Sequence, residues 1–296
     1  MNQPRLSIVV IEFNMAREIA RTILSLSPIV QRDIGADDYE IILVDNGSSQ
    51  PSNHAALLEC GANLTLRRLD NAGPSPVRAI NIGLSLARGH LVGVMIDGAR
   101  MASPGLLSSA LQASHLYERG VISPLGFHLG RGPQTEAAQN GYDQEAEDAL
   151  LTSSDWIRDG YNLYDIAVIA PGQAGGWFRP LNESTALFMA KPMWNELNGF
   201  DERFSAPGGG LANVDTYIRA CHLPNAQPVM LLGEATFHQI HGGIASNAPP
   251  GKHPWEQFHK EYIAIRGAPL ETPRYEPICI GRVTQSAMKF IEPSIR

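Results

Sequence analysis

The chain has 296 residues, of which 44% are hydrophobic, and its formal net charge is −7. This length allows one large α/β domain or two small ones, with enough apolar side chains for a sizeable core. The negative charge disfavours a surface that neutralises nucleic-acid phosphates or anionic lipids, so we expect no nucleic-acid partner. The three cysteines are too widely spaced for a zinc or redox motif and indicate reduced thiols.

A targeting or membrane-spanning segment would show as a basic leader or a long apolar run. An apolar run begins at Leu6 without a basic leader, and no run of about 18 apolar residues occurs. We therefore expect neither secretion nor a transmembrane segment. A cytoplasmic location is the expectation, and peripheral attachment at the inner membrane surface is left open.

Strand-like and helix-like segments alternate over the first 120 residues. Apolar runs predict strands at residues 6–11, 40–44, 64–69 and 91–96 and near Val121, and helical spacing predicts helices at 15–26, 77–87 and about 104–119. Strands that alternate with helices in this way imply right-handed crossovers and a mostly parallel sheet covered on both faces.

The alternation fails between residues 126 and 176. Residues 141–159 are acidic and have a helical pattern. We interpret 126–180 as an insertion for acceptor binding or subunit contact, and a solvated surface excursion is an equal alternative. Regular structure resumes with a strand at 185–190, a helix at 192–197, a glycine-rich loop at 205–210, a helix from Asn213 and a strand at 228–232. Beyond Arg266, proline and polar residues predict an extended wrap or partial disorder.

Polar residues stand just beyond several predicted strands, where open α/β sheets bind their ligands. They are Glu12, Asn14, Asp45, Asn46 and Asp97. The chain contains no GxxxxGK(S/T), no complete GxGxxG and no GxSxG, which disfavours an ATPase, a classical dehydrogenase and a serine hydrolase. The strand-end residues are therefore the leading candidates for a binding site.

Five motifs follow one another on these elements: SIVVIEFN at 7–14, ILVDNGSS at 42–49, NAG with Arg78 and NIG at 71–83, VMIDGAR at 94–100, and GFDE at 199–202 followed by Asp215 and Arg219. Their order resembles that of glycosyltransferase family 2 and its relatives with the GT-A fold, over about residues 6–243. Each motif is weak alone, and the resemblance depends on all five standing in order.

The resemblance implies an α/β GT-A fold, Rossmann-like, with a mostly parallel central sheet flanked by helices and an irregular acceptor-side half. It divides the chain into a nucleotide-sugar-binding half at 1–125, the insertion at 126–180, an acceptor and catalytic half at 181–266 and a C-terminal extension at 267–296. The implied activity is transfer of a sugar from a nucleoside diphosphate sugar to a hydroxyl acceptor, as in polysaccharide or glycoconjugate synthesis. A homodimer is left open.

The resemblance also implies a set of donor-binding residues. In the family, the aspartate at the position of Asp45 contacts the base, and Asp97 stands where the family carries its Asp-x-Asp. Simpler roles stay open: Asp45 and Asp97 as turn residues, Glu12 as a solvated carboxylate, and Arg78 as a helix-surface residue instead of a diphosphate contact. The donor-binding set is Glu12, Asn14, Asp45, Asn71, Gly73, Arg78 and Asp97.

A divalent cation, Mn²⁺ or Mg²⁺, is the implied cofactor. The second acidic position of Asp-x-Asp is Ala99, so one expected ligand is missing. Asp97 together with His238 and His241 offers a replacement, because carboxylate oxygen and imidazole suit Mn²⁺. Two alternatives stay open: Arg100 or Arg78 supplies the positive charge directly, or the histidines serve the core or a turn.

The acceptor side also departs from the family pattern. Counting back from Arg219 places Asn213 where inverting relatives use an aspartate as general base, and an amide cannot accept a proton as a carboxylate does. Some retaining relatives carry Glu-Asn there, so the change could mark retention. Asp215 or Glu183 could instead act as base, and Asp215 could simply cap its helix. The predicted catalytic residues are Asp215, Asn213 and Glu183.

Three other functions compete with this interpretation. Ala99 and Asn213 motivate a catalytically silent nucleotide-sugar-binding module. A sugar nucleotidyltransferase shares the sheet but needs a glycine-rich loop with a basic residue after the first strand, which residues 12–17 do not supply. A structural carbohydrate-binding protein would not need the series of strand-end aspartates.

Overall fold

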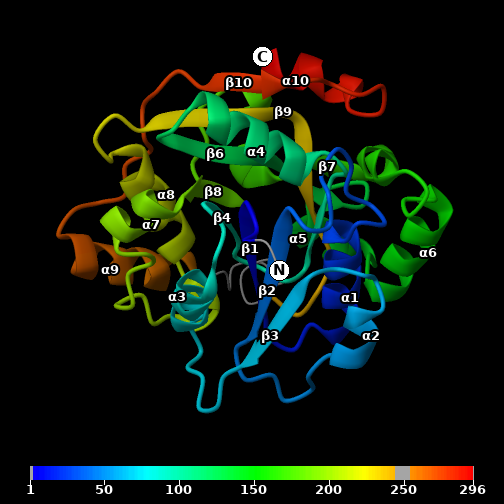
Figure 1. Cartoon of the computed structure of the whole chain (residues 1–296), viewed down its shortest axis with the longest axis horizontal. Coiled ribbons are helices and arrows are strands. Elements are labelled where there is room, and N and C mark those ends of the chain that lie inside the picture. Colours follow the sequence, from blue (N-terminus) through cyan, green and yellow to red (C-terminus); the bar gives the residue numbers. More distant parts are fainter. Residues whose placement is uncertain (1–2, 244–253, 296) are drawn as a thin grey trace.

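The computed structural model describes residues 3–243 and 254–295. Residues 244–253, inside the predicted acceptor half, and residues 1–2 and 296 at the ends of the predicted segments lie outside the described residues. Ten described strands form one sheet, and helices cover both of its faces (Figure 1). This arrangement confirms the predicted α/β class with a mostly parallel central sheet.

The strands are β1 (Leu6–Glu12), β2 (Tyr39–Asp45), β3 (Leu64–Arg68), β4 (Leu91–Met95), β5 (Arg100–Ala102), β6 (Gly120–Leu129), β7 (Ala167–Ile169), β8 (Leu187–Ala190), β9 (Gln227–His238) and β10 (Ile278–Gly281). The helices are α1 (Ala16–Leu26), α2 (His54–Leu58), α3 (Val77–Leu86), α4 (Leu106–Leu116), α5 (Gln134–Ala137), α6 (Gln144–Ser154), α7 (Lys191–Leu197), α8 (Ala212–Cys221), α9 (Trp255–Arg266) and α10 (Ile291–Ile295). Short 3₁₀ turns include Gly160–Ile166 and Gly176–Phe178.

The strand order is β10-β9-β6-β8-β4-β1-β2-β3, which runs from top to bottom in Figure 1. Strands β4, β1, β2 and β3 are mutually parallel, and β6, β9 and β10 form a second parallel group. Strand β8 lies antiparallel between β4 and β6 and joins the two groups. The carboxyl ends of β1, β2 and β4 therefore share one edge.

Alternating side chains of the buried strands supply two cores. Along β1, Ile8 and Val10 belong to the core that α1, α2 and α4 cover, whereas Val9 and Ile11 face the helices α3, α7 and α8. Helix α1 presents Ile19, Ile23 and Leu26 to the first core, as their helical spacing predicts. Because both faces are covered, β1 and β2 are buried along their whole length and read as continuous apolar runs.

The structure differs from the sequence prediction mainly after residue 120. Strand β6 extends to Leu129, across the predicted boundary at residue 125, because it pairs with β9 along its length. Helix α6 confirms the helical pattern inside 141–159. Strand β9 is longer than predicted and carries His238 as its last residue. The short strands β5 and β7 were not predicted, because three residues are too few to show a period of two.

The C-terminal segment forms an ordered wrap along one edge of the sheet (Figure 1). Strand β10 adds in parallel to β9, and the Ser294 hydroxyl accepts a hydrogen bond from the Trp177 amide at 3.2 Å. The extended wrap is thus confirmed over the described tail, with a strand and a helix that the sequence did not indicate. Among the residues described here, no helix combines the length and apolar composition needed to cross a bilayer.

Candidate functional site

Three predicted carboxylates lie at the shared carboxyl edge of β4, β1 and β2. Glu12 ends β1 and is paired in register with Asp45, which ends β2, while Asp97 follows β4 on the other side of β1. Asp45 and Asp97 therefore lie at the same edge, but β1 separates their strands β2 and β4, so the two strands are not neighbours. Parallel pairing alone accounts for this convergence, since it aligns the ends of neighbouring strands.

Glu12 and Asn14 hold the loop that follows β2. Both oxygens of the fully buried Glu12 carboxylate accept hydrogen bonds from Ser52, at 2.9 Å from its amide and 3.0 Å from its hydroxyl. Burial raises the pKa of Glu12, and these hydrogen bonds offset only part of that effect. The Asn14 side-chain oxygen accepts from the amide of Ser49 at 2.8 Å. The solvated role considered for Glu12 is therefore wrong, because the loop covers it.

Asp45 is also engaged by neighbouring groups. Its Oδ1 accepts from the Ser48 amide at 2.7 Å, and its Oδ2 accepts from Nη1 of Arg68 at 2.6 Å. The second guanidinium nitrogen of Arg68 donates to the Ser48 carbonyl at 2.7 Å. The turn role considered for Asp45 describes the first of these contacts, and base recognition stays a prediction.

The remaining predicted donor residues lie between β3 and the first turn of α3. Asn71 and Gly73 are exposed, and the Gly73 carbonyl accepts from the Asn46 side chain at 3.1 Å, which ties this link to the end of β2. Arg78 is exposed in the first turn of α3. Whether it contacts a diphosphate stays a prediction.

Asp97 lies in a turn that is fixed on three sides. Its Oδ1 accepts from the Ala99 amide at 2.8 Å, and the Gly98 carbonyl accepts from the Thr22 hydroxyl at 2.6 Å. Gly98 packs against the Ile11 carbonyl so closely that a Cβ there would collide with the oxygen. The turn role is thus real, and it leaves Oδ2 of Asp97 pointing away from the turn.

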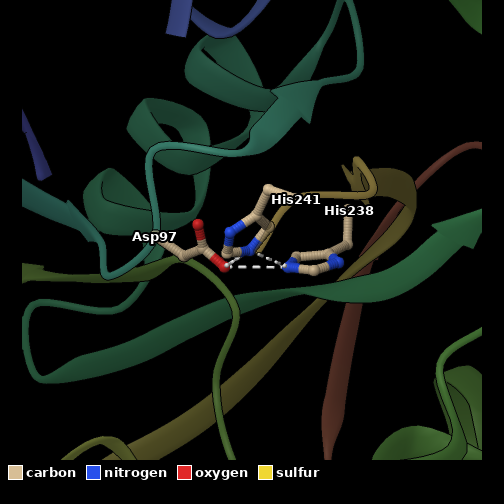
Figure 2. Close-up of side chains that lie close together, drawn as sticks. All are labelled: Asp97, His238 and His241. Atoms are coloured by element: carbon tan, nitrogen blue, oxygen red, sulfur yellow. Dashed lines mark hydrogen bonds and ion pairs between the residues drawn. The ribbon is translucent and has the colours of Figure 1, made fainter. Parts of the chain in front are cut away.

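Pairing between β5 and β9 brings the two histidines to Asp97. Arg100 lies opposite His238 in the ladder, and the Ala99 carbonyl accepts from the Gln239 amide at 2.8 Å. Figure 2 shows the three side chains converging: Oδ2 of Asp97 lies 2.9 Å from Nε2 of His238 and 3.5 Å from Nε2 of His241. The two Nε2 atoms lie 3.2 Å apart. These residues form a group able to hold a metal ion.

Electrostatics at this cluster favour a cation. Burial lowers the pKa of His238 to about 4, which outweighs the opposing effect of Asp97, so this imidazole is neutral at pH 7. Burial opposes ionisation of Asp97, but the neighbouring histidines His241 and His238 hold the pKa of its carboxyl well below its usual range. The Nε2 atom of this neutral imidazole and a carboxylate oxygen thus lie 2.9 Å apart. Two acceptors at that distance repel each other unless a proton or a metal ion lies between them.

Arg100 adds an uncommitted positive charge beside the cluster. Within the described residues, its Nε and Nη1 are buried and make no hydrogen bond. Its charge contributes to lowering the pKa of both His238 and His128, and burial brings the pKa of His128 to about 3. Buried guanidinium nitrogens without partners are costly, which makes an anionic ligand a natural occupant of the adjoining space.

Glu183 and Asn213 lie together on the acceptor side. The Asn213 amide donates to the Ser184 carbonyl at 2.7 Å and approaches Oε2 of Glu183 at 3.5 Å. Because β8 pairs antiparallel with β4, with Leu187 opposite Val94, the segment before β8 runs past the end of β4 toward Asp97. Glu183 is half-buried.

Asp215 is in a different situation, because two guanidinium groups occupy its buried carboxylate. Arg266 donates to Oδ1 at 2.5 Å and to Oδ2 at 2.7 Å, and Arg219 donates to Oδ2 at 2.8 Å. Arg266 comes from α9 and also contacts Asp201 at 2.8 Å. This network binds α8 to α9 and to the GFDE motif. The predicted catalytic set therefore separates into the pair Glu183 and Asn213 and the ion-paired Asp215.

The GFDE motif lines a cavity of 1110 Å³ between α3 and α7 that contains none of the predicted site residues. Asn81 of α3 accepts from the Phe200 amide at 2.9 Å and donates to the Phe200 carbonyl at 2.9 Å. The contacts of the motif therefore connect α3, α7 and α8.

Sequence reasoning missed three residues at this edge. Phe13, between Glu12 and Asn14, keeps 47% of its surface exposed. Gln134 and Glu147, both inside the predicted insertion, contact the segment that carries the two histidines. An aromatic residue in a strand-end motif was a usable signal for Phe13. Nothing in the sequence links Gln134 or Glu147 to His238, about a hundred residues away.

The comparisons with known proteins agree with this geometry. Residues 7–113 match the family model described as Glycosyl transferase family 2. The comparison with curated proteins gives no significant match. Among solved structures, S. aureus TarS 1–349 in complex with UDP-GlcNAc is similar with a TM-score of 0.58 and 16% identity, covering 90% of this chain and 68% of that one.

A second similar structure is the mannosyltransferase PcManGT from Pyrobaculum calidifontis in complex with GDP-Man and Mn²⁺, with a TM-score of 0.54 and 17% identity, covering 92% of this chain and 66% of that one. In another structure of TarS 1–349, the match has a TM-score of 0.55 and 15% identity and covers 79% of this chain. The chain spans 60% of the length of that protein. The chain thus has the GT-A fold, and its residues 7–113 match the model of glycosyl transferase family 2.

Proposed function

We propose that the protein is a glycosyltransferase that moves a sugar from a nucleoside diphosphate sugar to a hydroxyl acceptor. One observation carries the proposal: Asp97, His238 and His241 converge at the carboxyl edge of the strands that match the family. The neighbours solved with UDP-GlcNAc and with GDP-Man and Mn²⁺ support a nucleoside diphosphate sugar as donor. Cytoplasmic location, peripheral membrane attachment and a homodimer stay predictions.

The residues of the cluster fit a divalent cation. With bonds of about 2.1 Å, two ligands at right angles around one ion lie about 3.0 Å apart. The separations of 2.9, 3.2 and 3.5 Å between the three side chains are compatible with neighbouring ligands of one such ion. One carboxylate with two imidazoles suits Mn²⁺ better than Mg²⁺, which prefers oxygen ligands and water. When bound, the cation would neutralise charge on the leaving diphosphate.

The protein's own cations complete the diphosphate subsite. Arg100 offers Nε and Nη1 without partners among the described residues, and it lies opposite His238. Arg78 is exposed in the first turn of α3, where a helix N-terminus also favours anions. These two residues would bind the diphosphate from opposite sides of the carboxyl edge.

The nucleoside would lie over the ends of β1 and β2. Phe13 presents an exposed ring there, and an aromatic face can stack on any base. Asp45, Glu12 and Asn14 hold the 48–52 loop, so they define the wall of the base pocket and its hydrogen-bonding groups. Asn71 and Gly73 supply the neighbouring link.

Glu183 is the base that we assign to the acceptor. The acceptor hydroxyl would give its proton to the Glu183 carboxylate while its oxygen forms the new bond to the anomeric carbon of the donor sugar. The bond from that carbon to the diphosphate oxygen breaks, and the diphosphate leaves with the electron pair. Asn213, 3.5 Å from Oε2 of Glu183, would position this carboxylate or the acceptor. Asp215 would act indirectly by fixing α8.

A silent binding module has less support after these observations. That alternative was based on Ala99 and Asn213. Each of these positions has a neighbouring residue that could take over the role of the missing carboxylate. His238 lies 2.9 Å from Asp97, and Glu183 lies beside Asn213. Turnover of a nucleoside diphosphate sugar in a donor panel would exclude the silent module directly.

The decisive experiment measures nucleoside diphosphate binding by calorimetry and thermal shift, with and without Mn²⁺. Wild-type protein should bind one nucleoside diphosphate only when Mn²⁺ is present, and ligand at 100 times its Kd should add about 2.7 kcal/mol of stability. In Asp97→Asn, adding Mn²⁺ should no longer bring about nucleoside diphosphate binding. Asp165→Asn, an exposed aspartate in the 3₁₀ turn before β7, is the matched control and should bind as wild type. Equal binding by Asp97→Asn and wild type would refute the site.

A further inference from the structure

Helices α5 and α6, both inside the predicted insertion, make direct hydrogen bonds to the segment 238–241. Gln134 of α5 contacts His238, and Glu147 of α6 contacts Ile240. Both side chains are completely buried. The segment therefore takes part of its conformation from a region that no motif of the family accounts for.

The orientation of the Gln134 amide is fixed by two contacts with one residue. Its Nε2 donates to the His238 carbonyl at 2.8 Å, so its Oε1 must be the atom that lies 2.5 Å from Nδ1 of His238. A carboxamide oxygen only accepts, so Nδ1 of His238 carries the proton. In a neutral imidazole the other nitrogen then holds the lone pair, and this nitrogen is the Nε2 that faces Asp97.

The backbone amide and carbonyl of Ile240 are both bonded by members of an ion pair, Arg17 of α1 and Glu147 of α6. Its amide donates to Oε2 of Glu147 at 2.7 Å, and its carbonyl accepts from Nη1 of Arg17 at 3.3 Å. Arg17 in turn contacts Oε1 of Glu147 at 3.2 Å. His241 follows directly, so this contact fixes the backbone from which its imidazole reaches the cluster.

We propose that Gln134 and Glu147 are positioning residues for the pair His238 and His241: Gln134 selects the tautomer that presents Nε2, and Glu147 fixes the backbone of the second histidine. This gives the segment 134–148 the role of a supporting frame. The inference rests on the metal site of the proposed function. Partners of this kind typically change metal affinity by about 10- to 100-fold.

The first test needs no metal. Imidazole ¹⁵N NMR of the metal-free protein, with His238 assigned by its loss in His238→Gln, should show His238 protonated at Nδ1. Gln134→Leu should abolish that preference, and Gln134→Glu should restore it because a carboxylate also accepts from Nδ1. A wild-type His238 without a proton on Nδ1 would overturn the assignment.

The second test measures Mn²⁺ affinity by calorimetry. Gln134→Leu and Glu147→Leu should each weaken Mn²⁺ binding by about 10- to 100-fold. Gln31→Leu removes a buried glutamine that donates to the carbonyls of Ser25 and Ser103, and Glu234→Leu removes a buried carboxylate on β9. Both variants should keep wild-type Mn²⁺ affinity. A loss of affinity in the controls as large as in the test variants would show a general effect of destabilisation and overturn the inference.

The two proposals fail in different ways. If wild-type protein binds Mn²⁺ and the Gln134 and Glu147 variants bind it equally well, the supporting frame is wrong and the metal site stands. If wild-type protein binds no divalent cation, the metal site is wrong, and the NMR result still decides whether Gln134 sets the tautomer of His238.

Discussion

Asp215→Asn separates a structural aspartate from a catalytic one. The Asp215 carboxylate is 1% exposed and accepts three hydrogen bonds from Arg266 and Arg219, at 2.5, 2.7 and 2.8 Å. An asparagine keeps the shape but turns one acceptor into a donor that faces a guanidinium group. Removing one partner of a buried ion pair costs about 3–5 kcal/mol. Both guanidinium groups keep some contact with water, and Arg266 keeps Asp201, so we expect about 3 kcal/mol.

Urea unfolding followed by tryptophan fluorescence measures this change in the free energy of unfolding. At roughly 2–4 °C per kcal/mol for domains of 150–250 residues, the midpoint of thermal unfolding should fall by roughly 6–12 °C. Glu196→Gln breaks an exposed ion pair with Arg119 and should cost under about 1 kcal/mol. A change below about 1 kcal/mol for Asp215→Asn, together with a turnover loss of 10²–10⁴-fold in folded protein, would refute the structural role and make Asp215 the base.

Three further changes test the site and its surroundings. Glu183→Gln should lower turnover by roughly 10²–10⁴-fold while nucleoside diphosphate affinity, measured by calorimetry, stays unchanged; a loss of affinity instead would move Glu183 to the donor side. Phe13→Ala should weaken nucleoside diphosphate binding by about 1–3 kcal/mol and leave pyrophosphate binding unchanged, and equal losses for both ligands would exclude stacking. Burial raises the pKa of Glu234 from 4.5 to about 7, so between these values the folded state keeps a proton that the unfolded state has lost. The free energy of unfolding of the wild type therefore falls as pH rises from 4.5 to 7. Over this range the stability of Glu234→Gln should increase by about 3 kcal/mol relative to that of the wild type, which unfolding at a series of pH values measures.

The fold of the first half could be predicted because its strands are long and buried. Strands β1 and β2 are seven-residue runs buried on both faces, which sequence periodicity detects easily. The parallel pairing that follows puts Glu12, Asp45 and Asp97 at one edge. That much follows from local pattern and general rules of sheet topology.

The rest of the site depends on contacts that no local pattern carries. The three-residue strand β5 decides that His238 lies beside Asp97, and its pairing partner is more than a hundred residues away. The carboxylate of Asp215 meets Arg266 from α9, a helix that the sequence prediction did not include. Glu12 looks exposed in the sequence because the covering residue, Ser52, belongs to the loop of a different strand.

The two departures from the family pattern share a physical explanation under the proposed function. Ala99 and Asn213 each stand where the family carries a carboxylate, and in both places the candidate substitute lies on or just before a strand of the second half, His238 on β9 and Glu183 before β8. His238 arrives through the pairing of β9 with β5, directly after Ala99, and Glu183 arrives through the segment that continues β8 past β4. The substitutes therefore depend on sheet register and not on motif spacing. A shift of one residue in the β5–β9 pairing would turn His238 to the opposite face, so the register of that pairing should be under tighter constraint than the residue type at Ala99.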